Sequence, residues 1–228
     1  MQANELWKLY ASGESTIQAV KGVSVAVEKG EMIAIMGPSG CGKTTLLNVL
    51  SGIDEPTSGK VTIDGKSLFG VSDDERSNMR AEYLGFIFQD FNLLPVLSAV
   101  ENVELPLLML GKSANEARKT ALEALVAVGL GERSEHRPSE LSGGQQQRVA
   151  IARAIVHQPS VVLCDEPTGN LDSSTSKSVI NLLKSINKNM GTTFLLVTHD
   201  SAVAAQCTRV LTMEDGEIVS DERGYEEE

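Results

Sequence analysis

A glycine-rich run at residues 37–44 is the feature of this 228-residue chain with the most direct chemical meaning. It reads Gly37-Pro-Ser-Gly-Cys-Gly-Lys43-Thr44 and fits the spacing G-x-x-x-x-G-K-[ST]. Its glycines allow a tight turn and leave backbone N–H groups free to surround phosphate oxygens. Lys43 adds a positive charge for the β- and γ-phosphates, and the Thr44 hydroxyl is a ligand for Mg²⁺. The run therefore predicts a phosphate loop, the name used below for residues 37–44.

Two carboxylates at the end of an apolar run supply a second part of such a site. Residues 161–164 read Val-Val-Leu-Cys and lead directly into Asp165 and Glu166. Asp165 at a strand tip can hold Mg²⁺, usually through water. Glu166 is then placed to orient the attacking water or to accept its proton as a general base. An ordinary acidic turn after a strand is the alternative, and the phosphate loop makes it the weaker one.

A second glycine-rich helix start lies at residues 141–145, the signature segment. It reads Leu141-Ser-Gly-Gly-Gln145, and the residues Ser142, Gly143 and Gly144 could present N–H donors to an anion. A Ser-Gly-Gly helix start is common and means little alone. Here it precedes the strand with the two carboxylates, in a chain that also carries a phosphate loop.

These groups need strands and helices to position them. Met32–Met36 is a short apolar run that predicts a buried strand leading into the phosphate loop, and the apolar pattern of residues 45–50 predicts a helix after it. Further strands or Asp-Gly hairpins are predicted at residues 23–27, 61–66, 161–164, 194–198 and 210–219.

Helices are predicted mainly between residues 98 and 157 and at Ser173–Met190. Ser113-Ala-Asn-Glu116 is a capping box, and apolar residues follow it on one helical face. Ser173–Met190 has apolar residues at i, i+3, i+4 and i+7 and ends before Gly191. The pattern predicts a mostly parallel α/β core, an N-terminal antiparallel β subdomain and an inserted α-helical subdomain.

The composition describes an acidic folded protein. Hydrophobic residues make up 41%, and 20 basic against 31 acidic residues give a formal charge of −11. This negative net charge disfavours a protein whose surface binds nucleic acid or anionic lipid. Apolar stretches such as residues 103–110 are shorter than the ~20 residues of a membrane span, and no signal peptide is visible. Cys41, Cys164 and Cys207 show no CxxC spacing, so we expect reduced thiols in a cytosolic protein.

The order and context of these motifs resemble the ATP-binding-cassette (ABC) ATPases over essentially the whole chain. The resemblance implies a P-loop NTPase (RecA-like) core at residues 1–90 and 158–228, with the helical subdomain at 91–157, in one domain. It implies ATP and Mg²⁺ as cofactors. Tyr10 matches the aromatic residue that stacks on adenine, although a strand-end tyrosine packed on the core is the alternative. The other implied ATP contacts are Gly37, Pro38, Ser39, Gly40, Cys41, Gly42, Lys43, Thr44 and Thr45.

The resemblance also assigns the residues of hydrolysis. Gln89 matches the glutamine that contacts Mg²⁺ and the lytic water, and it begins the link to the helical subdomain. His199, after the apolar run at 194–198, matches the histidine that contacts the γ-phosphate. Glu166, His199 and Gln89 are thus the implied catalytic residues. Thr44, Gln89 and Asp165 are the implied magnesium ligands.

In this family the signature segment of one subunit closes over the nucleotide of another. The resemblance therefore implies a dimer with a second copy of this chain, or with a relative, around two ATP molecules. The residues implied to act across the interface are Ser142, Gly143, Gly144, Gln145 and Asp172. Asp172 is also a candidate N-cap for the helix Ser173–Met190, and both roles can hold.

The absence of a predicted span implies a separate integral membrane partner of the permease type. The chain would then be cytoplasmic and peripheral at the inner face of the membrane. The apolar segment 91–107 is expected to form core and a groove for a cytosolic helix of that partner. The residues of these motifs resemble those of the lipoprotein-release, macrolide-export and cell-division subgroup of this family. A polar amino-acid importer and a regulatory ATPase that gates a membrane protein are the alternatives. A soluble repair or translation ATPase is disfavoured by length and charge, so no nucleic-acid partner is expected.

Overall fold

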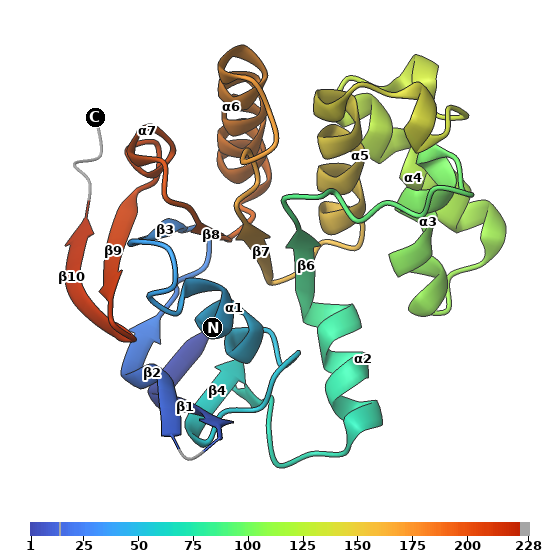
Figure 1. Cartoon of the computed structure of the whole chain (residues 1–228). Coiled ribbons are helices and arrows are strands. Elements are labelled where there is room, and N and C mark those ends of the chain that lie inside the picture. Colours follow the sequence, from blue (N-terminus) through green and yellow to red (C-terminus); the bar gives the residue numbers. More distant parts are fainter. Residues whose placement is uncertain (14, 224–228) are drawn as a thin grey trace.

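Two β-sheets organise the computed structural model, which describes residues 1–13 and 15–223 (Figure 1). The larger sheet has the order β10-β9-β3-β8-β7-β6, and the smaller has the order β2-β1-β4-β5. The strands are β1 Gln2–Ser12, β2 Ser15–Ala26, β3 Met32–Met36, β4 Ser58–Ile63, β5 Lys66–Ser67, β6 Leu84–Ile87, β7 Val161–Asp165, β8 Phe194–Val197, β9 Arg209–Glu214 and β10 Glu217–Arg223.

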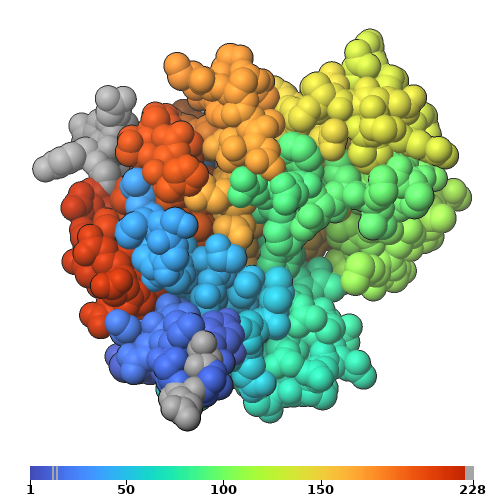
Figure 2. All heavy atoms as spheres, in the orientation of Figure 1, coloured from blue at the N-terminus to red at the C-terminus, as the bar shows by residue number. Residues whose placement is uncertain are grey.

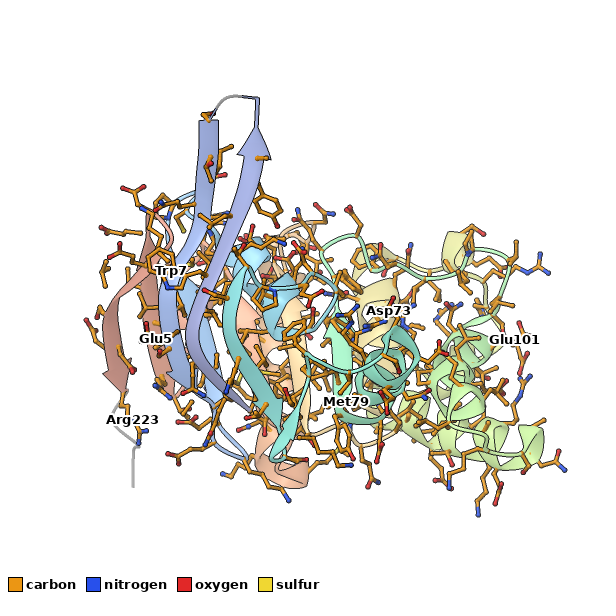
Figure 3. All side chains as sticks on the ribbon, turned by 90° about the horizontal axis from the view of Figure 1, so that it is seen from below. Glu5, Trp7, Asp73, Met79, Glu101 and Arg223 are labelled. Carbon is orange, nitrogen blue, oxygen red and sulfur yellow. The ribbon has the colours of Figure 1, made fainter. Side chains whose placement is uncertain are left out.

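Helices cover one face of the larger sheet, a helix and the smaller sheet cover the other face, and helices also lie beyond its β6 edge (Figure 1). The chain segments that include α3 to α5 form one side of the molecule, green to yellow in the space-filling view (Figure 2). Glu101 of α3 and Trp7 of the smaller sheet lie toward opposite sides (Figure 3). The helices are α1 Lys43–Leu50, α2 Asp73–Tyr83, α3 Ala99–Met109, α4 Ala114–Ala127, α5 Gly143–Ile155, α6 Ser173–Met190 and α7 Ser201–Ala204, with 3₁₀ turns at Gly131–Arg133 and Pro138–Glu140.

The central strands are apolar throughout because both of their faces are buried. In β3, Ala34 packs into a core with the helices α3 to α6, while Ile33 and Ile35 pack into a second core with α1 and the smaller sheet. The side chains of β8 alternate in the same way, with Leu196 in the first core and Leu195 in the second. Such strands show continuous apolar runs instead of alternation. The sequence predictions for these strands are confirmed.

Parallel pairing brings the ends of three strands to one edge. β3 pairs parallel to β8, and β8 pairs parallel to β7. Val197 lies opposite both Ile35 and Asp165 in this register. The phosphate loop, Glu166 and His199 all follow these strand ends, so the sheet places them together at the carboxyl ends of its parallel strands.

The two Asp-Gly hairpins and the Ser113 capping box are confirmed. Asp64 and Gly65 both have positive φ values, 49° and 78°, as do Asp215 and Gly216 at 45° and 87°. This is the geometry that tight hairpins require, and Asp and Gly tolerate it. Ser113 Oγ accepts the Glu116 N–H, and the Glu116 carboxylate accepts from Ser113 in return.

Several elements, among them β1, β6, α2 and α7, were not predicted from the sequence. The predicted strand at residues 23–27 is the end of the much longer β2, whose partner β1 was not predicted. α2 was also missed, because none of its residues is buried and it shows no apolar stripe. Its start carries a capping box at Ser72 and Glu75, which was the available signal.

No helix of residues 1–13 and 15–223 is both long enough and apolar enough to cross a membrane. The boundaries at residues 91 and 157 stay a prediction. α3, α4 and α5 pack on one another, and α5 also packs on β6.

Candidate functional site: a nucleotide cavity and a separate signature helix

Glycine is required at two positions of the phosphate loop because other backbone approaches closely. Gly37 has φ 155° and Gly42 has φ 106°. A Cβ on Gly37 would lie 2.1 Å from the Met213 carbonyl oxygen, and one on Gly42 would lie 2.1 Å from that of Ala19. Gly42 is also the N-cap of α1, and no side chain caps this helix start. The first amides of α1 therefore stay available to bind phosphate oxygens.

The ammonium group of Lys43 lies against the backbone of the phosphate loop. Its Nζ donates to the carbonyl oxygens of Gly37 at 2.9 Å and Pro38 at 2.8 Å. The residue is only 7% exposed. No ion pair to Lys43 appears in the part of the chain that the structure describes, so its charge is available to an anionic ligand.

Thr44 and Asp165 supply oxygen atoms suited to Mg²⁺. Thr44 Oγ1 donates to Asp165 Oδ1 at 3.4 Å. Burial raises the pKa of Asp165, as does the neighbouring Glu166 carboxylate, whereas Thr44 and Lys43 act in the opposite direction. A hydroxyl and a carboxylate are hard ligands of the kind Mg²⁺ prefers, and a cation would offset the cost of burying this carboxylate. Within residues 1–13 and 15–223, no three His, Cys, Asp or Glu side chains form a metal site. The ion would thus need further oxygen ligands from nucleotide and water.

Glu166 and His199 form a contact beside these groups. His199 Nδ1 lies 2.8 Å from Glu166 Oε1. Glu166 adopts a left-handed φ of 45°, and its N–H donates to the Val197 carbonyl at 2.9 Å. Such a conformation is costly for a non-glycine residue and persists only where surrounding structure enforces it. The turn holds the carboxylate beside the phosphate loop, where it could accept a proton from water.

Tyr10 reaches the same cavity from β1. Its hydroxyl donates to Asp54 Oδ2 at 2.6 Å, and Lys8 Nζ lies 4.9 Å from the ring centroid. Burial, followed by Asp54, raises the pKa of this tyrosine. The side chain is 39% exposed, so the core-packed alternative is not favoured. The cavity measures about 590 Å³, and the predicted residues that line it are Tyr10, Ser39, Gly40, Cys41, Gly42, Lys43, Thr44, Thr45, Glu166 and His199.

Of the predicted ATP and magnesium contacts, Gly37, Pro38 and Asp165 do not line this cavity, and neither does Gln89. Gln89 Nε2 donates to Asn170 Oδ1 at 3.0 Å, and Asn170 Nδ2 donates to Asp90 Oδ1 at 2.7 Å. Magnesium would bind Gln89 Oε1, whereas the contact with Asn170 uses Nε2, and the role of Gln89 as a magnesium ligand stays a prediction. Asn170 was missed from the sequence because its partner is 81 residues away.

The signature segment lies apart from the cavity within one chain. Ser142 is the N-cap of α5, its Oγ accepts the Gln145 N–H at 3.4 Å, and Gln145 Oε1 accepts the Ser142 N–H at 3.0 Å. Neither residue lines the phosphate cavity. α5 belongs to the helical side of the molecule, whereas α1 lies beside the smaller sheet (Figure 1). The signature segment therefore does not line the nucleotide cavity of its own chain.

Asp172 caps α6, as one of its two predicted roles requires. Its Oδ1 accepts the N–H groups of Ser174 at 3.0 Å and Thr175 at 3.1 Å. The hydroxyls of the same two residues also donate to the carboxylate. Together they hold the pKa of Asp172 far below its usual range. Contact of Asp172 with a second subunit stays a prediction.

Comparison with known proteins agrees with this geometry. The model of the ABC transporter family matches residues 20–169, and the chain belongs to this family. It is 45% identical over 222 residues to the lipoprotein-releasing system ATP-binding protein LolD of Legionella pneumophila (strain Lens), covering 97% of this chain and 98% of that protein. It is 46% identical to the macrolide export ATP-binding/permease protein MacB of Hyphomonas neptunium, covering 97% of this chain and 34% of that protein.

A solved structure shares the whole fold. It is described as a dimeric post-hydrolysis state of the ATP-binding cassette MJ0796 bound to ADP and Pi. The TM-score is 0.89 at 44% identity, and the match covers 98% of this chain and 99% of that one. The chain is therefore an ATP-binding, ATP-hydrolysing cassette that uses ATP and Mg²⁺, and the predicted family and fold class are confirmed.

Replacing Lys43 by alanine should nearly abolish ATP binding. A hydrogen bond to a charged group contributes roughly 1.5–3 kcal/mol, so we expect the Kd for Mg-ATP to rise at least about tenfold. Isothermal titration calorimetry measures it, with Lys119→Ala on the exposed surface of α4 as the matched control. Unchanged affinity in a folded Lys43→Ala variant would refute the assignment of the phosphate loop.

Proposed function

We propose that this cassette works as a pair of copies, with each ATP bound between the phosphate loop of one copy and the signature segment of the other. The observation that carries the proposal is the separation of these segments within one chain. The Ser142 end of α5 presents a helix start, yet it does not line the cavity that contains Lys43. A head-to-tail pair would bring each such helix start to the other copy's nucleotide. The dimeric state of the similar MJ0796 structure supports this arrangement.

Within that pair, ATP acts as the link between the copies. It contacts both chains only in the closed pair, so it stabilises closure by its differential affinity. Lys43 and the α1 amides bind the β- and γ-phosphates, Thr44 and Asp165 hold Mg²⁺, and Tyr10 stacks on the base. Glu166 accepts a proton from the attacking water, with His199 beside the γ-phosphate. Loss of that phosphate loosens the pair.

The ATP cycle drives a membrane protein that binds in a groove at the C-terminal half of α5. This groove measures about 480 Å³ and lies between α2, α3, β6 and α5. Its lining includes the exposed Met109 and the aromatic Phe86 and Phe88, but no Asp or Glu of the described residues. Arg80 and Arg153 line it too, and neither pairs with a carboxylate of residues 1–13 or 15–223. In a chain of net charge −11, this groove suits a partner segment with an apolar face and a carboxylate.

The partner is a permease-type membrane protein, and the cassette is peripheral at the cytoplasmic face. Its work is lipoprotein release, export or another mechanical movement across the membrane. Similarity to proteins named LolD and MacB favours this over the import of polar amino acids. A regulatory ATPase that gates its partner would use the same groove, so it is distinguished only by assaying cargo movement in the reconstituted complex.

Glu166→Gln should retain ATP binding, lose most turnover and accumulate the dimer. General base catalysis contributes typically about 100- to 10,000-fold, so kcat should fall by at least about 100-fold. Sedimentation should show a monomer without nucleotide and a dimer with Mg-ATP. A variant that stays monomeric at saturating Mg-ATP contradicts the shared-nucleotide arrangement, and a variant with normal kcat removes Glu166 as the base.

Met109→Glu should weaken binding of the membrane partner, because it places a negative charge at an apolar groove proposed to receive a carboxylate. Met109 is 76% exposed, and Met190→Glu is the matched control because Met190 is 53% exposed and lies outside the groove. Tagged variants are purified from detergent extracts of the source cells, and the bound proteins are identified by mass spectrometry. One membrane protein should be retained by the wild type and the control but lost by Met109→Glu. Equal retention, or bound nucleic acid instead, would overturn the groove assignment.

A further inference from the structure

Gln147 is a fully buried polar side chain on α5, the helix that begins at the signature segment. Its exposure is 0%. Its Nε2 donates to the Pro167 carbonyl oxygen and lies 3.5 Å from that of Phe88. Pro167 directly follows Glu166, and Phe88 directly precedes Gln89. One amide group thus contacts the two loops that carry these predicted catalytic residues.

The side-chain amide of Gln147 has partners for its nitrogen only. The neighbouring carbonyls only accept hydrogen bonds, so the amide nitrogen must face them and the oxygen must face away. Gln147 Oε1 is buried and has no hydrogen-bond partner in the described part of the chain. A leucine of similar volume would remove this unpaired acceptor, but it would also leave the buried Pro167 carbonyl oxygen without the donor that Gln147 supplies. The amide therefore binds the loop carbonyl oxygens through its nitrogen, while its oxygen has no partner among residues 1–13 and 15–223.

The contacts around Gln147 join α5 to both loops. Arg153, also on α5, donates to the carbonyl oxygens of Asn92 and, at 2.8 Å, Phe91. α5 therefore holds the segment 88–92 at both ends. The Gln89–Asn170 contact links that segment to the loop that follows Glu166. A change in the position of either loop must change the contacts of Gln147.

We infer that Gln147 is a positioning residue that couples the orientation of α5 to the placement of Gln89 and Glu166 in the same chain. Ser142 lies five residues before Gln147, about one and a half helical turns away, and a helix moves as a rigid element over that length. The nucleotide in one copy's cavity thereby sets how its own α5 presents Ser142 to the other copy. The inference rests on the proposed function, in which Ser142 acts across the pair.

The test compares Gln147→Leu with a matched amide elsewhere. Asn187 on α6 also donates to two carbonyls, those of Gly30 and Thr192, each at 2.8 Å, and it lies outside the nucleotide cavity. Gln147→Leu should keep the monomer's Kd for ATP within about twofold. Its kcat should fall at least about tenfold, and in the Glu166→Gln background the dimer dissociation constant should rise at least about tenfold. Asn187→Leu should change none of these by more than about twofold.

A second variant, Gln147→Glu, tests the donor itself. Only a protonated carboxyl group can donate to the Pro167 carbonyl, so kcat relative to the wild type should recover as pH is lowered. Circular dichroism checks folding of each variant. The inference is overturned if Gln147→Leu keeps kcat and dimerisation within twofold, or if Asn187→Leu loses both equally. Failure of Glu166→Gln alone to dimerise would instead refute the proposed function.

Discussion

The parallel register of β3, β8 and β7 is the constraint on which the site depends. Val197 stands opposite both Ile35 and Asp165, so the phosphate loop, the carboxylates and His199 leave the sheet at one edge. A slip of one residue would turn each strand's side chains to the opposite face. Because these strands pack into cores on both faces, such a slip would mismatch two packed layers at once.

α5 is the element that connects this edge to the rest of the molecule. Its N-terminal end is the signature segment, its middle contacts the loops of Glu166 and Gln89 through Gln147, and its C-terminal half borders the apolar groove. A single helix therefore touches the three places where ATP, a second copy and a membrane partner are proposed to act. This arrangement gives a physical route by which hydrolysis at one site could move the others.

Much of the nucleotide site could be predicted from the sequence, because its determinants are local. The spacing of residues 37–44 and the two carboxylates after the strand at 161–164 define the site without long-range information. Contacts between distant segments could not be read in this way. Asn170 and Gln147 became visible only in the fold, although an amide on the apolar face of a helix was a signal for Gln147. α2 was missed because it buries none of its residues.

Mixing two inactive variants tests the shared-nucleotide arrangement most directly. Lys43→Ala removes a phosphate contact, and Ser142→Arg blocks the signature segment. A mixed pair has one fully native site, made from the phosphate loop of the Ser142→Arg copy and the signature segment of the Lys43→Ala copy. An equal mixture is expected to regain up to about a quarter of wild-type ATPase activity, since half of the pairs are mixed and one of the two sites in each mixed pair is native. A mixture as inactive as its two components would contradict the shared-nucleotide arrangement.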